Sequence, residues 1–152
     1  MGKESPNIRM RDIEILLRCF GTLLYGDQYK TSMVKFLNNF ARDATKNFDE
    51  EKVEYLEKLF ESFLYSTRDL EADCFSTKKG KFNISIFEAI FKATCAPYLS
   101  DRGLIDHVIN PDAVNRLKEN NEFINATHHS TTRKDIVQKR LLIANSILNS
   151  ES

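Results

Sequence analysis

Hydrophobic residues recur along this chain at three- and four-residue steps, which is the spacing of one face of an α-helix. The first run predicts a helix over residues 12–25. Its main stripe consists of Ile13, Leu16, Leu17, Phe20 and Leu24. Ile15 and Cys19 add a second apolar face to the same segment. A helix that is apolar on two sides is expected in the centre of a fold rather than at its edge.

Two further runs predict helices over residues 31–44 and 49–67. The apolar stripe of the earlier one consists of Met33, Phe36, Leu37, Phe40 and Ala44. That of the later one consists of Val53, Leu56, Leu59, Phe60, Phe63 and Leu64. Opposite the later stripe stand the carboxylates Glu50, Glu54, Glu57 and Glu61. They do not converge on a cavity as the ligands of a two-metal site do, so we interpret them as a solvated helix face.

The second half of the chain contains shorter helical signals. One helix is expected to start near residue 85 and to end at Pro97, and another starts at the pair Asn110-Pro111. The stretch 125–131 is polar and resembles a loop, and a last helix then reaches residue 148. The spacing of Ser85 with Glu88, and of Thr132 with Asp135, is typical of a capping box at a helix start.

These elements predict an all-α protein. The expected architecture is a single bundle of five or six mostly antiparallel helices over residues 9–150, preceded by a disordered tail at residues 1–8. The chain has 152 residues, enough for one hydrophobic core, and contains only 5 Gly and 3 Pro. No apolar run approaches the roughly 20 residues of a membrane span, and the N-terminus lacks the apolar region of a secretion signal.

Charge and cysteine content further narrow the classes of protein to which this chain can belong. The chain has 22 Lys and Arg against 22 Asp and Glu, so it has no overall basic field to attract nucleic acid. Its three cysteines are widely spaced and form no CxxC pair, which fits reduced thiols in a cytoplasmic protein. We expect Cys19 and Cys95 to pack in the core, because nothing in the sequence supplies a base to activate them.

No familiar catalytic, metal-binding or cofactor-binding motif occurs in the chain. His128 and His129 are adjacent, whereas two zinc ligands on one helix stand three or four residues apart. We therefore expect no metal and no cofactor. The best local candidate for contact with a phosphate is a basic patch, although Asp135 dilutes it and no aromatic residue is interleaved to stack a base. The patch consists of Arg133, Lys134, Lys139 and Arg140.

Four segments, taken in order, resemble a widespread bacterial family. Residues 9–20, RMRDIEILLRCF, look like its motif R-[M/W]-[K/R]-D-x-E-x-[V/I/L]-L-R-[F/C], and residues 29–38, YKTSMVKFLN, look like Y-x-x-[S/G]-[M/L]-x-x-F-L-N. Residues 82–89, FNISIFEA, look like N-x-x-[L/I]-F-[D/E]-A. Residues 130–140, STTRKDIVQKR, look like the closing motif with Ser-Thr, Val and Arg. In this family a ParB-like N-terminal domain carries a DGQQR motif, and GmrSD-type, modification-dependent restriction systems of phage defence belong to it.

The resemblance implies a function without catalysis. The DGQQR segment, which is the expected nuclease or nucleotide-handling centre of the family, is absent from this sequence. No catalytic residue can be carried over, and the chain by itself is not expected to be an enzyme. We expect a helical module that supports or docks an upstream ParB-like domain, in cis or in trans. The alternative is a stand-alone protein-interaction or regulatory helical bundle.

The charged start of the first helix is the expected docking element. It consists of Arg9, Arg11, Asp12, Glu14 and Arg18. Positive charge is unfavourable at a helix N-terminus, so Arg9 and Arg11 are expected to pair with an anionic group. That group belongs either to the ParB-like domain or to the acidic face 50–61 of this chain. The same five residues could also form no more than a salt-bridged helix start.

Overall fold

The computed structural model describes residues 6–30 and 32–150, with side chains from residue 11 onward. Within these ranges the chain forms α-helices and two short 3-10 helices, with no strand beyond one isolated bridge between Ser76 and Phe82. The α-helices are α1 (Pro6–Tyr25), α2 (Met33–Asn47), α3 (Glu50–Ser66), α4 (Ile84–Cys95), α5 (Pro111–Glu119), α6 (Asn121–His128) and α7 (Lys134–Leu148). The prediction of an all-α protein is confirmed.

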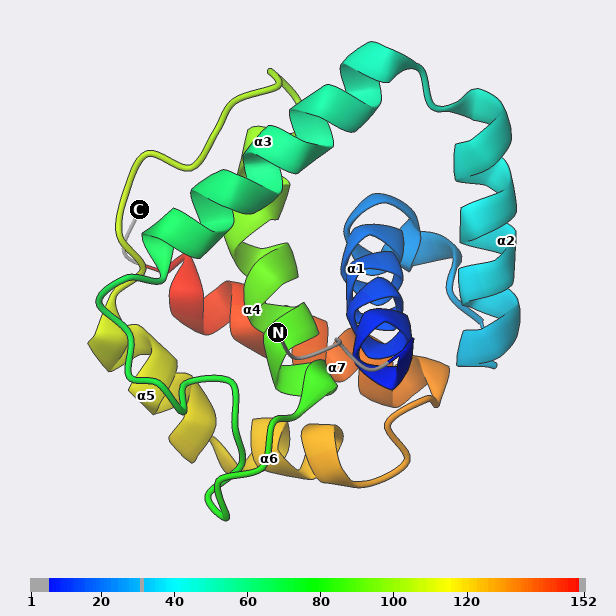
Figure 1. Cartoon of the computed structure of the whole chain (residues 1–152). Helices are drawn as coiled ribbons and strands as arrows, with labels where there is room; N and C mark the ends of the chain where they lie inside the picture. The colour runs from blue at the N-terminus through cyan, green and yellow to red at the C-terminus, as the bar shows by residue number, and fades with distance from the viewer. Residues whose placement is uncertain (1–5, 31, 151–152) are drawn as a thin grey trace.

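Helix α4 lies at the centre of the fold. All of its residues from Ser85 to Cys95 are buried except Lys92, which is half-buried. Helices α1, α3 and α7 pack against it, while α5 and α6 pack on α7 (Figure 1). This position explains the near-continuous apolar run of α4, since only a helix covered on every side can be apolar all round.

Aromatic rings fill the space between α1, α3 and α4. The ring of Phe91 lies edge-on to those of Phe20 and Phe63, with centroids 5.4 and 5.0 Å apart. Phe87 makes a similar edge contact with Phe63, at 5.7 Å. Such edge-to-face pairs are the favoured geometry for aromatic side chains. The abundance of Phe in the sequence is thus explained by the packing of this core.

Helices α2 and α3 form an arc around α1 (Figure 1). Helix α2 packs on α1, with the ring of Phe40 edge-on to that of Tyr25 at 5.4 Å. The hydroxyl of Tyr25 also donates a hydrogen bond to Asp43 on α2. At Gly21 an added Cβ would lie 3.3 Å from the ring of Phe36, so the absence of a side chain lets α2 approach α1 closely. Helix α3 reaches the core mainly through α4.

The structure corrects the predicted number of helices. The described residues form seven α-helices rather than five or six, because residues 121–128, expected to be partly loop, form α6. Asn120 caps α6 by accepting a hydrogen bond from the backbone N–H of Phe123, a signal overlooked in the sequence. Helix α1 begins at Pro6, so residues 6–8 of the expected tail are helical in backbone; residues 1–5 lie outside the described part of the chain.

Both predicted capping boxes are wrong. Asn83 caps α4, because its side-chain oxygen accepts hydrogen bonds from the backbone N–H groups of Ser85 and Ile86 at 2.8 and 3.2 Å. Glu88 is turned into the core instead of back to the helix start. At α7 the cap position is Arg133, which has no side-chain cap and pairs with Asp135.

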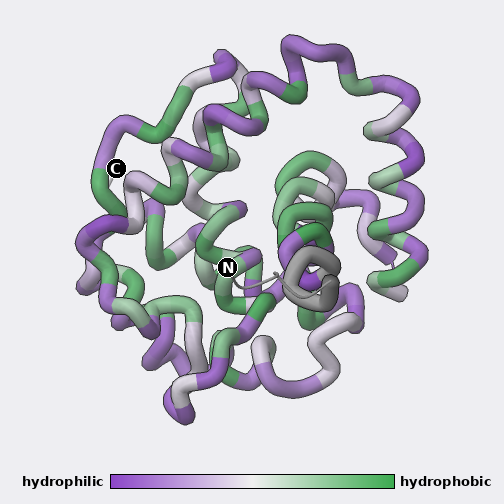
Figure 2. The backbone as a smooth tube through the Cα atoms, viewed as in Figure 1, coloured by the Kyte–Doolittle hydropathy of each residue, from purple (hydrophilic) through white to green (hydrophobic). Residues whose placement is uncertain are grey.

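The length and hydropathy of each helix show whether it could span a membrane. Within the described ranges, no helix combines the length and the apolar composition that crossing a membrane requires. Figure 2 shows hydrophobic positions concentrated along α4 and the middle of α1, with hydrophilic positions frequent along α2 and α3.

Candidate docking surface

The face of α1 that points toward the core is the one that contains Cys19, which the sequence predicted as an additional apolar face. Cys19 and Leu23 are buried there, together with Arg18 and Thr22. Of the predicted main stripe, Phe20 and Leu24 also pack against the core, whereas Ile13 is 56% and Leu16 38% exposed. Helix α1 thus has one apolar face that packs against α4, and another apolar face, with Ile13 and Leu16, that is only partly covered.

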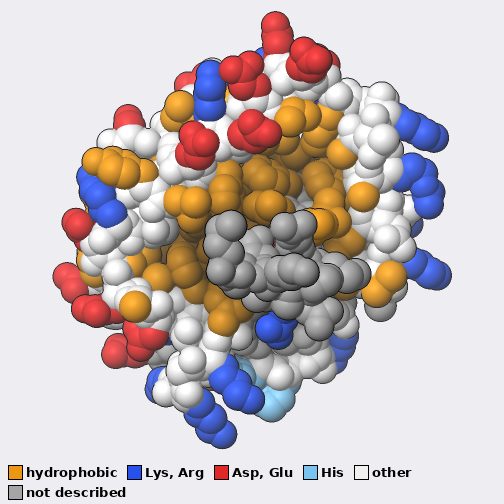
Figure 3. Space-filling model, in the orientation of Figure 1, with side chains coloured by type: hydrophobic (Ala, Val, Ile, Leu, Met, Phe, Trp, Pro, Cys, Tyr) orange, Lys and Arg blue, Asp and Glu red, His pale blue; other side chains and the backbone are white. Residues whose placement is uncertain are grey.

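The partly covered face borders a hollow between α1, α2 and α3. The hollow has a volume of about 240 Å³. Its lining is apolar apart from Glu57 and consists of Leu16, Leu17, Phe20, Phe40, Ala44, Phe48, Val53 and Leu56 with Glu57. Figure 3 shows hydrophobic side chains gathered inside the arc of α2 and α3. We call the apolar residues of this lining, with Ile13 and Val34, the α1–α2–α3 surface.

A second hollow continues this surface toward the start of α1. It has a volume of about 800 Å³ and shares Leu17 with the first. Val34 and Ile13 border it, and Val34 is 70% exposed. Arg11 and Glu14, two of the expected docking residues, line the same hollow. The structure therefore places charged residues beside an exposed apolar area, which is the usual composition of a protein interface with a polar rim.

The charge around the surface is unevenly distributed. The carboxylates predicted to face solvent on α3 are indeed exposed and lie along one border of the hollow (Figure 3). One of them, Glu54, forms an ion pair with Lys58 at 3.3 Å, and the neighbouring Glu51 forms one with Arg102 at 3.7 Å. Glu57, which lines the hollow, has no such partner among the described residues. The α3 border is accordingly acidic.

Arg18, another expected docking residue, is buried inside the protein. It is 7% exposed, and its Nε donates a hydrogen bond to Oε2 of Glu88 at 2.7 Å. Its Nη2 donates to Oγ of Ser85 at 3.0 Å. These bonds to α4 hold the guanidinium in the core, so Arg18 is not available to a docking partner. Arg11, Asp12 and Glu14 are exposed as the docking role requires, and the side chain of Arg9 lies outside the described part of the chain.

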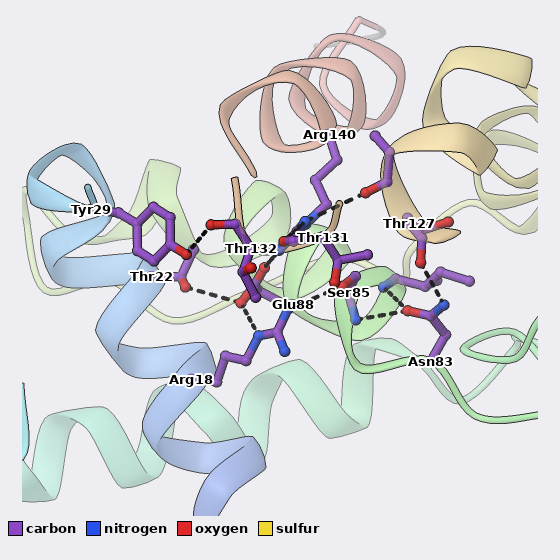
Figure 4. Close-up of polar contacts among 12 residues, drawn as sticks. Arg18, Thr22, Tyr29, Asn83, Ser85, Glu88, Thr127, Thr131, Thr132 and Arg140 are labelled. Atoms are coloured by element: carbon purple, nitrogen blue, oxygen red, sulfur yellow. Dashed lines mark hydrogen bonds and ion pairs between the residues drawn. The ribbon is translucent and has the colours of Figure 1, made fainter. Parts of the chain in front are cut away.

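Glu88 is the centre of a buried polar network that joins four parts of the chain (Figure 4). Its Oε1 accepts a hydrogen bond from Nη2 of Arg140 at 2.9 Å, while Oε2 accepts bonds from Arg18 and from Oγ1 of Thr22 at 3.1 Å. Glu88 and Arg140 have no solvent exposure. Arg140 also donates to the carbonyl oxygen of Thr131 at 2.6 Å. Burial lowers the pKa of Arg140, while the adjacent carboxylate of Glu88 acts in the opposite direction.

Of the four segments singled out in the sequence, residues 9–20, 82–89 and 130–140 contribute side chains to the network, and residues 29–38 contribute a separate hydrogen bond beside it. Arg18 belongs to the first, Glu88 to the third and Arg140 to the fourth. Tyr29, the first residue of the second, donates a hydrogen bond from its hydroxyl to the carbonyl oxygen of Thr132 in the fourth (Figure 4). These residues therefore have a structural role in this chain: they join α1, α4 and α7 from within.

The predicted phosphate-binding patch is not assembled as a patch. Arg140 is buried, so it cannot reach an external phosphate. Arg133 pairs with Asp135 at 2.8 Å, and Lys139 lies 3.8 Å from Glu122. Lys134 is exposed. Neutralisation by neighbouring carboxylates leaves this region with little attraction for an anion.

The residues most often found in catalytic or metal sites are scattered or buried. In the described part of the chain, no three His, Cys, Asp or Glu side chains are close enough to hold a metal ion. Cys19 and Cys95 are buried in the core, as predicted, and burial raises the pKa of both thiols. His128 and His129 are exposed at the end of α6.

Comparison with protein-family models, with curated proteins and with solved structures finds no match to this chain.

Proposed function

We propose that this chain is a non-catalytic helical module that docks a ParB-like domain on the α1–α2–α3 surface. The observation that carries the proposal is the partly covered apolar face of α1, where Ile13 and Leu16 remain exposed beside Val34 and Val53. Scattered exposed hydrophobic residues need no explanation, but a contiguous group rimmed by charge is typical of an interaction site.

The choice of partner rests on the resemblance and on the position of the charged residues. Arg11 and Glu14 line the hollow next to Ile13 and Leu17. An arginine there can make a bidentate contact with a carboxylate of a partner, while the apolar residues supply the buried area. The segment that resembles the family most specifically, residues 9–20, is the one that provides this border of the surface.

The buried network supports a structural rather than a catalytic role for the family-like residues. A catalytic residue must reach a substrate, whereas Glu88 and Arg140 are inaccessible. Each charged group in the network is occupied by hydrogen bonds to another part of the fold. Residues that maintain a scaffold in this way are suited to a module that positions a neighbouring domain.

Docking can be tested by co-expressing the chain with the ParB-like domain encoded nearest to it in the genome. We expect the two proteins to elute together from a size-exclusion column, and the variants Ile13→Asp and Val34→Asp to separate them. Leu142→Asp on α7 is the matched control. Leu142 is 69% exposed, close to the 70% of Val34, but it lies away from the α1–α2–α3 surface. Absence of a complex, or equal loss with the control, would contradict the proposal. A homodimer of this chain that Ile13→Asp dissolves would favour the stand-alone interaction module instead.

Arg11 provides a separate test of the charged border. Its side chain is exposed and forms no ion pair with a described residue, so Arg11→Ala should change the free energy of unfolding by less than about 0.5 kcal/mol. The same substitution should weaken the complex with the ParB-like domain. Urea unfolding and isothermal titration calorimetry measure the two effects. A loss of stability of about 2 kcal/mol or more would mean that Arg11 has an internal partner.

A further inference from the structure

The connection between α3 and α4 borders a groove on a different part of the molecule from the α1–α2–α3 surface. The groove has a volume of about 530 Å³, which is within the usual range for a ligand site. Four lysines line it: Lys78, Lys79, Lys81 and Lys118. No Asp or Glu is part of the lining. In a chain with equal numbers of acidic and basic residues, this is a local concentration of positive charge.

Three of these lysines are presented on an ordered turn. The backbone N–H of Thr77 donates to the carbonyl oxygen of Lys81 at 2.7 Å, and that of Gly80 donates to the carbonyl oxygen of Thr77 at 2.9 Å. Gly80 has a φ of 79°, a conformation that residues with a Cβ rarely adopt. An antiparallel bridge between Ser76 and Phe82 closes the turn. These bonds fix the backbone of the turn, and with it the points from which the three lysine side chains extend.

An exposed aromatic ring lies beside the lysines. Phe82 is 52% exposed, and its ring is supported from within by Phe87, with centroids 5.9 Å apart. The floor of the groove is apolar, formed by Ile86 and Ile124 with the largely buried Phe123. The hydroxyl-bearing residues Thr77 and Thr127 also line it. The groove therefore combines a flat apolar platform with a positively charged border.

We propose that this groove binds single-stranded nucleic acid, with a base on Phe82 and the adjacent phosphates between the lysines. Base stacking on an aromatic ring together with backbone contacts from basic residues is the general chemistry of single-strand recognition. A duplex is excluded from this arrangement, since its bases are stacked on one another and cannot place a face on Phe82. A polyanion without bases would use the lysines but gain nothing from the ring.

The proposal is tested with a fluorescent oligothymidylate of about eight nucleotides, titrated with the full chain and followed by anisotropy. We expect raising the salt from about 50 to about 200 mM to weaken binding roughly ten- to twenty-fold, as for about three phosphate contacts to a single strand. Phe82→Ala should weaken binding by at least about five-fold, because stacking on the ring is lost. The double variant Lys79→Glu/Lys81→Glu should weaken it by more than about ten-fold.

The controls separate the groove from general charge effects. The double variant Lys35→Glu/Lys46→Glu makes the same change in net charge on the exposed side of α2 and should leave binding within about two-fold. Polyphosphate should compete for the lysines with a strength that Phe82→Ala does not alter. Helix content by circular dichroism is checked for every variant. Binding that is absent at low salt, insensitive to Phe82, or equally reduced by the α2 variant would overturn the proposal.

Discussion

Glu88 is a charged residue with no solvent exposure, and the two guanidinium groups beside it belong to helices far away in the sequence. Burying an unpaired charge is very unfavourable, so each member of the network depends on the others. The stability of the contact between α1, α4 and α7 should therefore respond sharply to the loss of this one carboxylate.

Replacement of Glu88 by Ala should lower the free energy of unfolding by about 3–5 kcal/mol, because it leaves Arg18 and Arg140 buried without a counter-charge. Urea unfolding followed by circular dichroism measures the change. Glu57→Ala is the control: Glu57 is exposed on α3, and its loss should matter by no more than about 0.5 kcal/mol. If Glu88→Ala unfolds within about 1 kcal/mol of the parent protein, the network does not hold the helices together.

The three cysteines offer a second test at the same scale. All are buried, and burial raises the pKa of each thiol, so the thiolate that reacts with a disulfide reagent is less populated than in an ordinary cysteine. At pH 8 we expect Ellman's reagent to titrate none of the three thiols rapidly in the native protein and all of them in guanidinium chloride. One thiol that reacts within seconds in native buffer would show that its surroundings are open.

Single residues also show where sequence reasoning succeeded and failed. The burial of Cys19 and Cys95 was predicted because nothing nearby could activate them. The role of Glu88 was missed, although a lone carboxylate in the apolar run of residues 84–95 was a usable signal. Its local spacing with Ser85 suggested a cap, and only the distant Arg18 and Arg140 give it a better set of partners. A pattern within one helix does not contain that information.

At the level of elements, Asn83 rather than Ser85 fixes the start of the central helix. Its side chain accepts hydrogen bonds from two backbone N–H groups of α4 and donates one to the carbonyl oxygen of Thr127 on α6. Asn83→Ala should therefore destabilise the protein by about 1–2 kcal/mol, measured by thermal or urea unfolding. Asn115→Ala on the exposed side of α5 should change stability by less than about 0.5 kcal/mol. Equal effects of the two substitutions would be inconsistent with the cap.

The extents of α2, α3 and α4 could be predicted because their apolar residues follow the helical period and their ends carry recognisable residues. The face that α1 turns toward the core could not be predicted in this way. That helix is apolar on two sides, and periodicity alone does not say which side neighbours will cover. The pairing of Arg18 with Glu88 decides the matter, since it turns the side of Cys19 toward α4. Of the stripe predicted as core, Ile13 and Leu16 are exposed, while Phe20 still packs against Phe91.

At the scale of the whole molecule, the fold has two regions of different character. Helices α4 to α7 form the packed part around the central helix, whereas α2 and α3 extend around α1 as an arc (Figure 1). The α1–α2–α3 surface lies inside that arc, and the lysine groove is lined by the turn before α4 and by α5 and α6. Both candidate sites are formed by elements that are distant in the sequence. The sequence therefore indicated only one part of them, the charged start of α1.

Hydrogen–deuterium exchange tests most directly the proposal that a ParB-like domain covers the α1–α2–α3 surface. Exchange is measured by mass spectrometry for the chain alone and in the presence of the ParB-like domain. We predict slower exchange in residues 11–20, 33–48 and 50–57 on complex formation, with residues 111–128 unchanged. Protection confined to residues 111–128, or no protection at a concentration where the two proteins co-elute, would contradict the claim.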